Sequence, residues 1–336
     1  MTAAGPAADA PPAFTPARLA RVLAVAGGAW LVVAAACCLL GPIGPDVSQV
    51  PLRLRRVVPA SLVGAGLAVA GVALQSLLRN PLAAPSILGI NSGATIGAML
   101  AMMLAASGLG AAAGLATTTA GAAVGGAATI LAVYLAAQRR GLLDPYTLLL
   151  TGVIVNAFNG AMIMFLYLVA SQAVFKDAAI WAMGAIREQS SLAAVGVSAA
   201  VILAGWAVLL RLAKAFNVQA LGDDVASATG VRLGSLRLGT FAIAAVVTAA
   251  AVALSGPIGF VGLIVPHVCR RLFGADHRVL LVTAGFVGAA FVAAADTLCR
   301  SLVWLRTGEL PLGVITAAAG GPFFIVLLRR RLRATA

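Results

Sequence analysis

The sequence predicts an all-α integral membrane protein with about ten transmembrane helices. Of its 336 residues, 62% are hydrophobic and only 10% are charged, and the mean hydropathy is +1.05. Soluble domains carry about 25% charged and roughly 45–50% apolar residues, so a soluble globular fold is excluded. Glycine contributes 37 residues, and small residues at this density suit helices that pack closely in a bilayer.

Ten apolar segments approach the length of about 20 helical residues that a hydrocarbon core about 30 Å thick requires. The expected spans are 19–40, 57–78, 87–106, 111–137, 148–170, 192–210, 236–254, 258–268, 279–303 and 312–328. The eighth is short and is bracketed by Pro257 and Pro266. A broken helix is tolerated at membrane depth where protein or water satisfies its backbone, so this segment could dip in without crossing.

The chain is expected to hold one domain behind a tail. Residues 1–17 are rich in alanine and proline and have no basic n-region, so they predict a disordered cytoplasmic tail rather than a cleaved signal peptide. Residues 18–336 then form a single transmembrane domain.

Basic residues fall unevenly on the two sides of the predicted bundle. Sixteen of the 23 lysines and arginines lie on one side and seven on the other. The positive-inside rule assigns the richer side to the cytoplasm, together with both termini and a loop at about 215–235. The net charge of +13 is then largely a matter of topology, and no nucleic-acid partner is expected.

Five of the seven outer basic residues run against this bias. Arg53, Arg55 and Arg56 precede the second span, and Arg300 and Arg306 lie near the end of the ninth. Snorkelling toward lipid headgroups is one explanation. A docking surface for an acidic partner or an anionic solute is the other, and two separate groups of arginines favour it.

Motifs for catalysis are missing from the sequence. It has no Walker A loop, metalloprotease helix or nucleophile elbow, and the two histidines, His267 and His277, stand alone. Energy for uphill transport must come from a separate ATPase subunit or from an ion gradient. A gradient-driven secondary transporter would use intramembrane acids. Asp296 is nearly alone in that role and is spaced to pair with Arg300, which disfavours this alternative.

Uncharged polar residues are more plentiful within the spans. They include Gln75, Asn80, Asn91, Thr151, Asn156 and Asn159. Hydrogen bonds between helices explain most such residues. A wide pathway lined by amides, by methionines such as Met162 and by small residues would also suit a bulky ligand better than a bare ion.

Three groups of segments, in order along the chain, closely resemble signatures of the FecCD-type permeases. They are GAGLAVAG at 64–71 with RNPLA at 79–83 and PSILG at 85–89, then GPIGFVGLIVPH at 256–267 with DHR at 276–278, and finally ELPLG at 309–313 with GGPF at 320–323. These permeases are membrane subunits of type II ABC importers for iron–siderophore complexes, haem and vitamin B12. The resemblance covers nearly the whole chain after the tail.

The resemblance implies a fold and a set of partners. It implies ten transmembrane helices per subunit, with helices 2–5 and 7–10 related by an inverted pseudo-repeat. It implies a homodimer, or a heterodimer with a paralogue, in the cytoplasmic membrane of a prokaryote. It also implies a cytoplasmic ATPase dimer that holds ATP and Mg, and an extracytoplasmic substrate-binding protein, so that this chain binds no cofactor or metal.

The resemblance assigns residues to three roles. The ATPase-coupling segment comprises Leu221, Gly222, Asp223, Asp224, Ala226 and Gly230, and its acidic pair favours the start of a short helix. Docking of the binding protein is assigned to Arg53, Arg56 and Arg300. The resemblance places the cytoplasmic gate at about Tyr146 and Thr147. The pathway candidates, chosen from their place in or beside the spans, are Gln75, Asn80, Pro81, Asn156 and Asn159. The expected function is a permease for a bulky iron(III)–siderophore-type chelate, with cobalamin or haem as alternatives.

Overall fold

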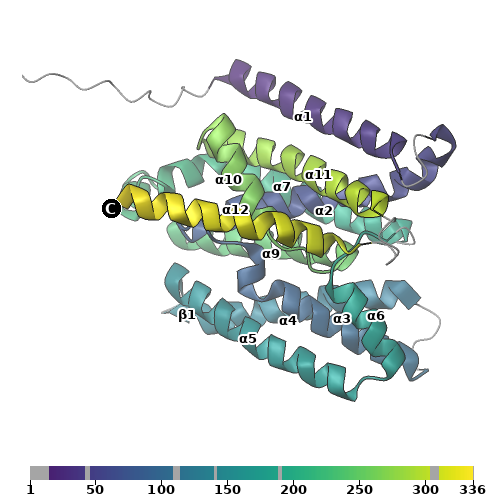
Figure 1. The fold of residues 1–336 in the computed structure, drawn as a ribbon. Helices are drawn as coiled ribbons and strands as arrows, with labels where there is room; N and C mark the ends of the chain where they lie inside the picture. Colours follow the sequence, from purple (N-terminus) through teal and green to yellow (C-terminus); the bar gives the residue numbers. More distant parts are fainter. Residues whose placement is uncertain are drawn as a thin grey trace, which may run out of the picture.

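The computed structural model describes residues 15–41, 46–108, 114–139, 142–187, 191–302 and 310–335, which form an almost entirely helical bundle (Figure 1). Most of the expected tail, together with Arg306 and Glu309, lies outside the described residues. The elements are α1 (Pro16–Leu39), η1 (Val47–Gln49), α2 (Val50–Leu77), η2 (Pro85–Leu88), α3 (Ile90–Ala106), α4 (Gly114–Ala137), β1 (Gln138–Arg139), β2 (Leu142–Leu143), α5 (Pro145–Val169), α6 (Gln172–Ala182), α7 (Leu192–Gln219), α8 (Asp223–Ala228), α9 (Leu233–Ser255), α10 (Val261–Phe273), α11 (His277–Ser301) and α12 (Leu312–Thr335).

Each of the ten predicted spans corresponds to a helix. Among the described residues, seven helices are long and apolar enough to cross a membrane, namely α1, α2, α4, α5, α7, α9 and α11. The apolar helix α3 and the apolar part of α12 are shorter. Helix α10 has 13 residues and contains Pro266, as expected of the broken eighth segment. The all-α membrane fold is confirmed.

Two helices differ from the expected spans. Helix α6 carries Lys176 and Asp177 in its 11 residues, and these charges hide it from a search for apolar segments. Helix α7 continues past residue 210 to Gln219, because Ala213 and Phe216 keep one face buried while Arg211 and Lys214 point outward. The loop expected at about 215–235 is therefore shorter, and it contains α8.

Helix α2 lies at the centre of the bundle. Most of α2, α9 and α11 is buried within the chain, whereas α1, α5 and α7 are largely exposed. The glycines of the 64–71 segment explain how closely α2 is packed. A Cβ added to Gly64 would lie 2.1 Å from the carbonyl oxygen of Gly288 on α11, and one added to Gly71 would lie 2.1 Å from that of Gly262 on α10. Only glycine permits these backbone contacts.

The packing of helices follows the expected pseudo-repeat. Helices α2 and α9 pack on each other, and exchanging α2–α5 for α9–α12 maps the contacts among these eight helices onto one another. Thus α3 packs on α4, α5 and α9, while α10 packs on α11, α12 and α2; likewise α4 packs on α9 and α5, while α11 packs on α2 and α12. This pattern is the one that two related four-helix sets produce.

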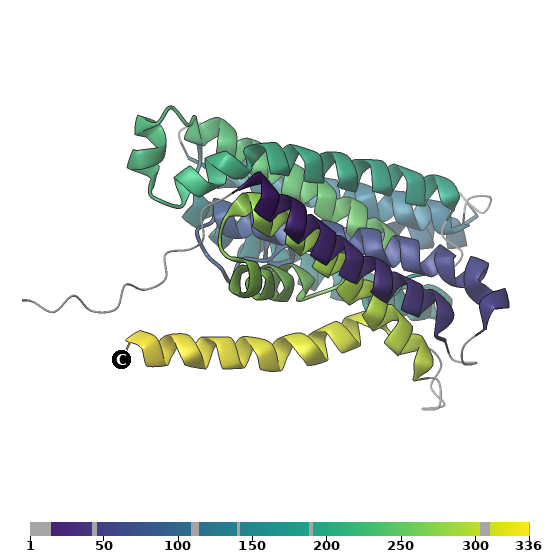
Figure 2. The same ribbon diagram turned by 90° about the horizontal axis from the view of Figure 1, so that it is seen from above.

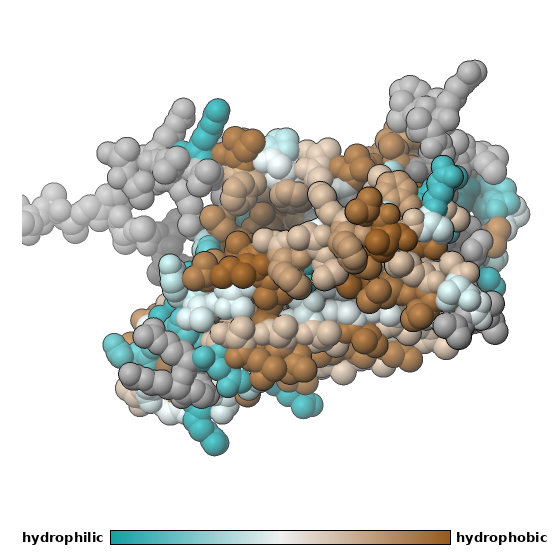
Figure 3. All heavy atoms as spheres, turned by 90° about the horizontal axis from the view of Figure 1, so that it is seen from below, coloured by the Kyte–Doolittle hydropathy of each residue, from teal (hydrophilic) through white to brown (hydrophobic). Residues whose placement is uncertain are grey.

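The bundle has two distinct ends. Figure 2 shows that α12 ends and α1 begins toward the same end, where α7 also ends and α8 follows; we call it the α8 end. Helix α6 lies at the opposite end in Figure 1, which we call the α6 end. Hydrophilic residues gather toward both ends, and a broad apolar belt lies between them in the face drawn in Figure 3. Such a belt is what a membrane-spanning bundle presents to lipid.

Candidate functional site

Helix α8 protrudes at the α8 end between two glycines. Gly222 precedes it with a φ of 135° and Gly230 follows it with a φ of 84°, and L-residues with side chains avoid such angles. The short helix that the acidic pair favoured is thus confirmed. Ala226 is fully buried and anchors the turn, whereas Leu221 is 73% exposed and Val225 is 43% exposed. Helix α8 and the turn before it therefore present apolar side chains outward from a basic end of the molecule.

Asp223 connects α8 to two neighbouring helices. Its Oδ1 accepts a hydrogen bond of 2.6 Å from Arg79 Nη2, and its Oδ2 accepts one of 2.7 Å from Arg237 Nη2. Arg79 lies just after α2, and Arg237 belongs to the first turns of α9. Asp224, by contrast, is exposed. Sequence reasoning missed Arg237, because nothing in its spacing shows that α9 returns to α8.

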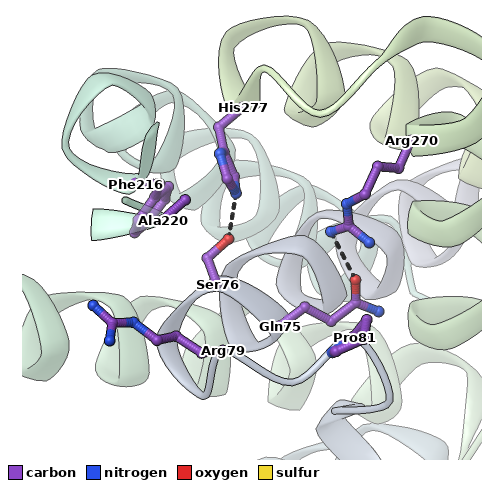
Figure 4. Close-up of a pocket in the computed structure, with 8 residues that line it drawn as sticks. All are labelled: Gln75, Ser76, Arg79, Pro81, Phe216, Ala220, Arg270 and His277. Carbon is purple, nitrogen blue, oxygen red and sulfur yellow. Dashed lines mark hydrogen bonds between the residues drawn. The ribbon is translucent and has the colours of Figure 1, made fainter. Parts of the chain in front are cut away.

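A pocket of about 280 Å³ lies beside α8 (Figure 4). It is lined by Gln75, Ser76, Arg79, Pro81, Phe216, Ala220, Arg270 and His277. Arg270 reaches across from α10 and donates to Gln75 Oε1 at 3.1 Å, and Gln75 Nε2 donates to the carbonyl of Gly262 at 3.3 Å. Gln75 thereby joins the end of α2 to α10.

The DHR segment fixes the start of α11. Asn217 Oδ1 accepts from the backbone nitrogen of His277 at 2.9 Å and lies 2.7 Å from its Nδ1, while Asn217 Nδ2 donates to Asp276 at 2.8 Å. On the other side, His277 Nε2 lies 2.6 Å from Ser76 Oγ. Burial raises the pKa of Asp276, but hydrogen bonds from Arg278 and Asn217 outweigh it and lower that pKa to about 2. Its carboxylate is therefore ionised at neutral pH.

The predicted pathway residues fall into separate groups in one chain. Asn80 Oδ1 caps its own turn by accepting from Leu82 N at 2.9 Å, next to Gln75 and Pro81 at the pocket. Asn159 Nδ2 instead donates to Ser92 Oγ of α3 at 3.1 Å, and Ser92 Oγ donates to Asn156 at 2.8 Å. Gln75 and Asn80 form one amide pair, and Asn156 and Asn159 form the other. The two amide pairs have different bonding partners and do not line one common pathway within a single chain.

The predicted gate coincides with the start of α5. Asp144 caps this helix, because its Oδ2 accepts from Thr147 N at 2.8 Å and from Thr147 Oγ1 at 2.7 Å. Pro145 occupies the first position of the helix, where its missing N–H costs nothing. The neighbouring Tyr146 is exposed.

A larger cavity of about 670 Å³ opens between α3, α4 and α5. Glycine, alanine and leucine make up most of its wall, and Met162 also lines it. Asn159 and Thr129 are its polar members and bond to each other at 3.4 Å. The cavity is suited to apolar groups rather than to ions.

The arginines assigned to a docking surface are buried at the α6 end. Arg53, Arg56 and Arg300 are 5%, 7% and 6% exposed, and the first two lie inside α2 rather than in a loop. Asp296 lies between two of them: Arg56 Nη2 and Arg300 Nε are each 3.2 Å from its carboxylate. The Asp296–Arg300 pair expected from their spacing is confirmed, whereas the three arginines assigned to a docking surface are buried in the single chain rather than exposed.

Arg53 forms a different contact. Its Nη1 donates to the carbonyl oxygens of Cys38 and Leu39 at the end of α1. Those carbonyls have no partner within the helix, so Arg53 ties the end of α1 to α2. Arg55, between the buried arginines, is exposed.

Comparison with known proteins decides the family. The sequence profile of the FecCD transport family matches residues 38–330. The chain belongs to this family. The cobalamin import system permease protein BtuC of Halobacterium salinarum is 41% identical over 290 residues, which cover 85% of this chain and 75% of that protein. The ferric enterobactin transport system permease protein FepG of Escherichia coli is 38% identical over 281 residues, covering 84% and 82%.

A solved structure agrees with this assignment. It is described as an inward-facing conformation of a metal-chelate type ABC transporter, and it matches with a TM-score of 0.82 at 30% identity over 93% of this chain and 99% of that chain. The FecCD protein is thus a multi-pass permease of an ABC importer. Its role implies an ATPase and a substrate-binding protein as partners. Within the described residues, no group of three or more His, Cys, Asp or Glu side chains could hold a metal ion.

Proposed function

We propose that this FecCD permease imports a bulky iron(III)–siderophore-type chelate and that α8 is its contact with the ATPase. The observation that carries the ATPase contact is the geometry of α8. The turn before α8 exposes Leu221 and α8 itself exposes Val225, while Ala226 and Asp223 hold α8 to the bundle. Apolar side chains exposed on a polar end of a protein mark an interaction site.

Substitution of the exposed leucine in the turn just before α8 tests this contact. Leu221→Asp places a charge on the surface that the ATPase would cover, and charges are depleted from interface cores. The variant should insert into the membrane and lose co-purification with the ATPase. Leu192→Asp, at a similarly exposed leucine at the opposite end of α7, is the matched control and should keep the association. Full association of the Leu221→Asp variant with the ATPase would contradict the assignment.

Substrate class is inferred from size and from relatives. The amides and the apolar cavity wall suit a large, partly apolar chelate, and the FepG relative is described as a ferric enterobactin permease. Cobalamin is the second candidate, because the relative at 41% identity is described as a cobalamin permease. Uptake of a radiolabelled ferric catecholate, a ferric hydroxamate and cyanocobalamin by the reconstituted importer distinguishes them. Uptake of cyanocobalamin alone would overturn the first choice.

We further propose a dimer whose two copies enclose the pathway. The long apolar face of α5 supports this, since Ile154, Phe158, Phe165 and Leu168 are all exposed in the single chain. The separation of the two amide pairs also fits a pathway completed by a second copy. The mass of the detergent-solubilised permease, measured by light scattering, should be that of two chains. A monomer that still supports transport would contradict the dimer.

Docking of the binding protein at Arg53, Arg56 and Arg300 requires that carboxylates of the partner replace bonds made within the chain. The double variant Arg53→Lys, Arg56→Lys keeps both charges but loses the planar fork that pairs with carboxylates. It should fold and dock the binding protein more weakly, with a smaller dependence on salt. Docking equal to that of the parent across a salt titration would restrict these arginines to a structural role.

A further inference from the structure

Asp223 is shared by two guanidinium groups that come from different helices. Arg79 takes Oδ1 at 2.6 Å and Arg237 takes Oδ2 at 2.7 Å, and the side chains of Arg79 and Asp223 are 40% and 37% exposed. Each carboxylate oxygen therefore points to one partner. The first residue of α8 is held simultaneously to the end of α2 and to α9.

Arg79 makes a third connection. The same Nη2 donates to the carbonyl oxygen of Gln219, the last residue of α7, at 2.9 Å. Arg79 also has a φ of 46°, a left-handed conformation that is uncommon for residues other than glycine. Figure 4 shows the side chain of Arg79 at the edge of the pocket, extending away from Gln75 and Pro81. Its guanidinium reaches Asp223 of α8. Arg79 thus links α2, α7 and α8.

The elements that meet here are central to the fold. Helix α8 packs against α7 and α9, and Arg79 adds a link to α2. Helices α2 and α9 are the pair that packs together at the centre of the pseudo-repeat. A displacement of α8 would therefore pull on both α2 and α9 through the carboxylate of Asp223.

From this geometry, and building on the proposed contact between α8 and the ATPase, we propose that Arg79 and Arg237 are positioning residues that transmit movement of α8 to α2 and α9. Ion pairs this exposed add little to the stability of a fold. Hydrogen bonds between charged groups nevertheless hold two elements in a defined relative orientation, because they are short and geometrically specific. The network therefore orients α8 rather than holding the bundle together.

Transport per ATP hydrolysed is the quantity that tests the proposal. The importer is reconstituted in liposomes with its ATPase and binding protein, and uptake and ATP hydrolysis are measured in the same vesicles. Complexes with Arg79→Ala or Arg237→Ala should still hydrolyse ATP, but the uptake per ATP should fall about fivefold or more. About fivefold is the lower limit of the coupling typically found between two sites. Arg79→Lys, which keeps the charge, should recover part of the loss.

Arg211→Ala is the matched control, since Arg211 is an exposed arginine of α7 at the same end. It should keep the parental ratio. Parental ratios in both the Arg79→Ala and Arg237→Ala complexes would overturn the inference. If an alanine variant does not assemble, Arg79→Gln and Arg237→Gln replace it, because glutamine retains a polar side chain. A lowered uptake per ATP in these variants supports the inference, and a parental value overturns it.

Failure of the proposed function is recognised separately. If Leu221→Asp leaves ATPase association intact, the contact assigned to α8 is wrong, whatever the arginine variants do. If Leu221→Asp abolishes association while the arginine variants keep the parental ratio, the contact stands and the transmission role of Arg79 and Arg237 is overturned.

Discussion

At the scale of single residues, Asp296 shows what spacing in a sequence can and cannot reveal. Its position four residues before Arg300 on one helix predicts their ion pair, and the structure contains it. Its second partner, Arg56, is 240 positions away on α2, so only tertiary packing brings them together. The same packing buries arginines that the sequence analysis assigned to a docking surface.

Asp296→Asn should destabilise the permease by about 3–5 kcal/mol, because it leaves two buried guanidinium groups without their carboxylate. Thermal unfolding of the purified protein in detergent measures the loss. Asp224→Asn is the matched control: Asp224 is exposed, so this variant should unfold at nearly the parental temperature. Equal unfolding temperatures for the two variants would contradict the role given to Asp296.

At the scale of elements, helices were predictable where composition is uniform along them. The ten apolar segments and the short α8 follow from hydropathy, glycines and the acidic pair. Helix α6 was missed because Lys176 and Asp177 interrupt its apolar pattern. The extension of α7 was missed because Arg211 and Lys214 end the apolar run while the helix continues. Charged residues on one face lower the mean hydropathy of a segment, so a search for apolar segments misses the helix.

Gly64→Ala should destabilise the bundle by about 1–3 kcal/mol, as overpacking does, since the added Cβ would lie 2.1 Å from the backbone oxygen of Gly288. Helices α2 and α11 would have to move apart. Gly28→Ala on α1 is the control, because nothing lies within 4 Å of its added Cβ, and alanine there favours the helix. Thermal unfolding should separate the two variants; a stable Gly64→Ala protein would show that α2 and α11 pack less closely.

At the scale of the whole molecule, the distribution of basic residues predicts that the α8 end faces the cytoplasm. The two lysines of the chain, Lys176 on α6 and Lys214 on α7, are exposed near opposite ends, and the four native cysteines are buried. Lys176→Cys should therefore react with a membrane-impermeant maleimide in intact cells, and Lys214→Cys only after permeabilisation. The reverse pattern would invert the topology.

The candidate site was less predictable than the fold. The coupling role of the 221–230 segment came from the family resemblance, and its acidic pair favoured only the start of a short helix. Arg237, Asn217 and Asp276 gained a role only from contacts across the bundle. The amides predicted to line one pathway divide between α2 and α5 in the single chain. Sequence order alone does not show which helices face each other across an axis between two chains.

The source of energy for uptake tests the account most directly. Proteoliposomes containing the permease, its ATPase and its binding protein are given a radiolabelled ferric siderophore, with or without ATP inside, and with ionophores that remove all ion gradients. The account predicts uptake that requires ATP and the binding protein and that persists when ionophores are present. Uptake that continues without ATP and collapses with the ion gradient would contradict it.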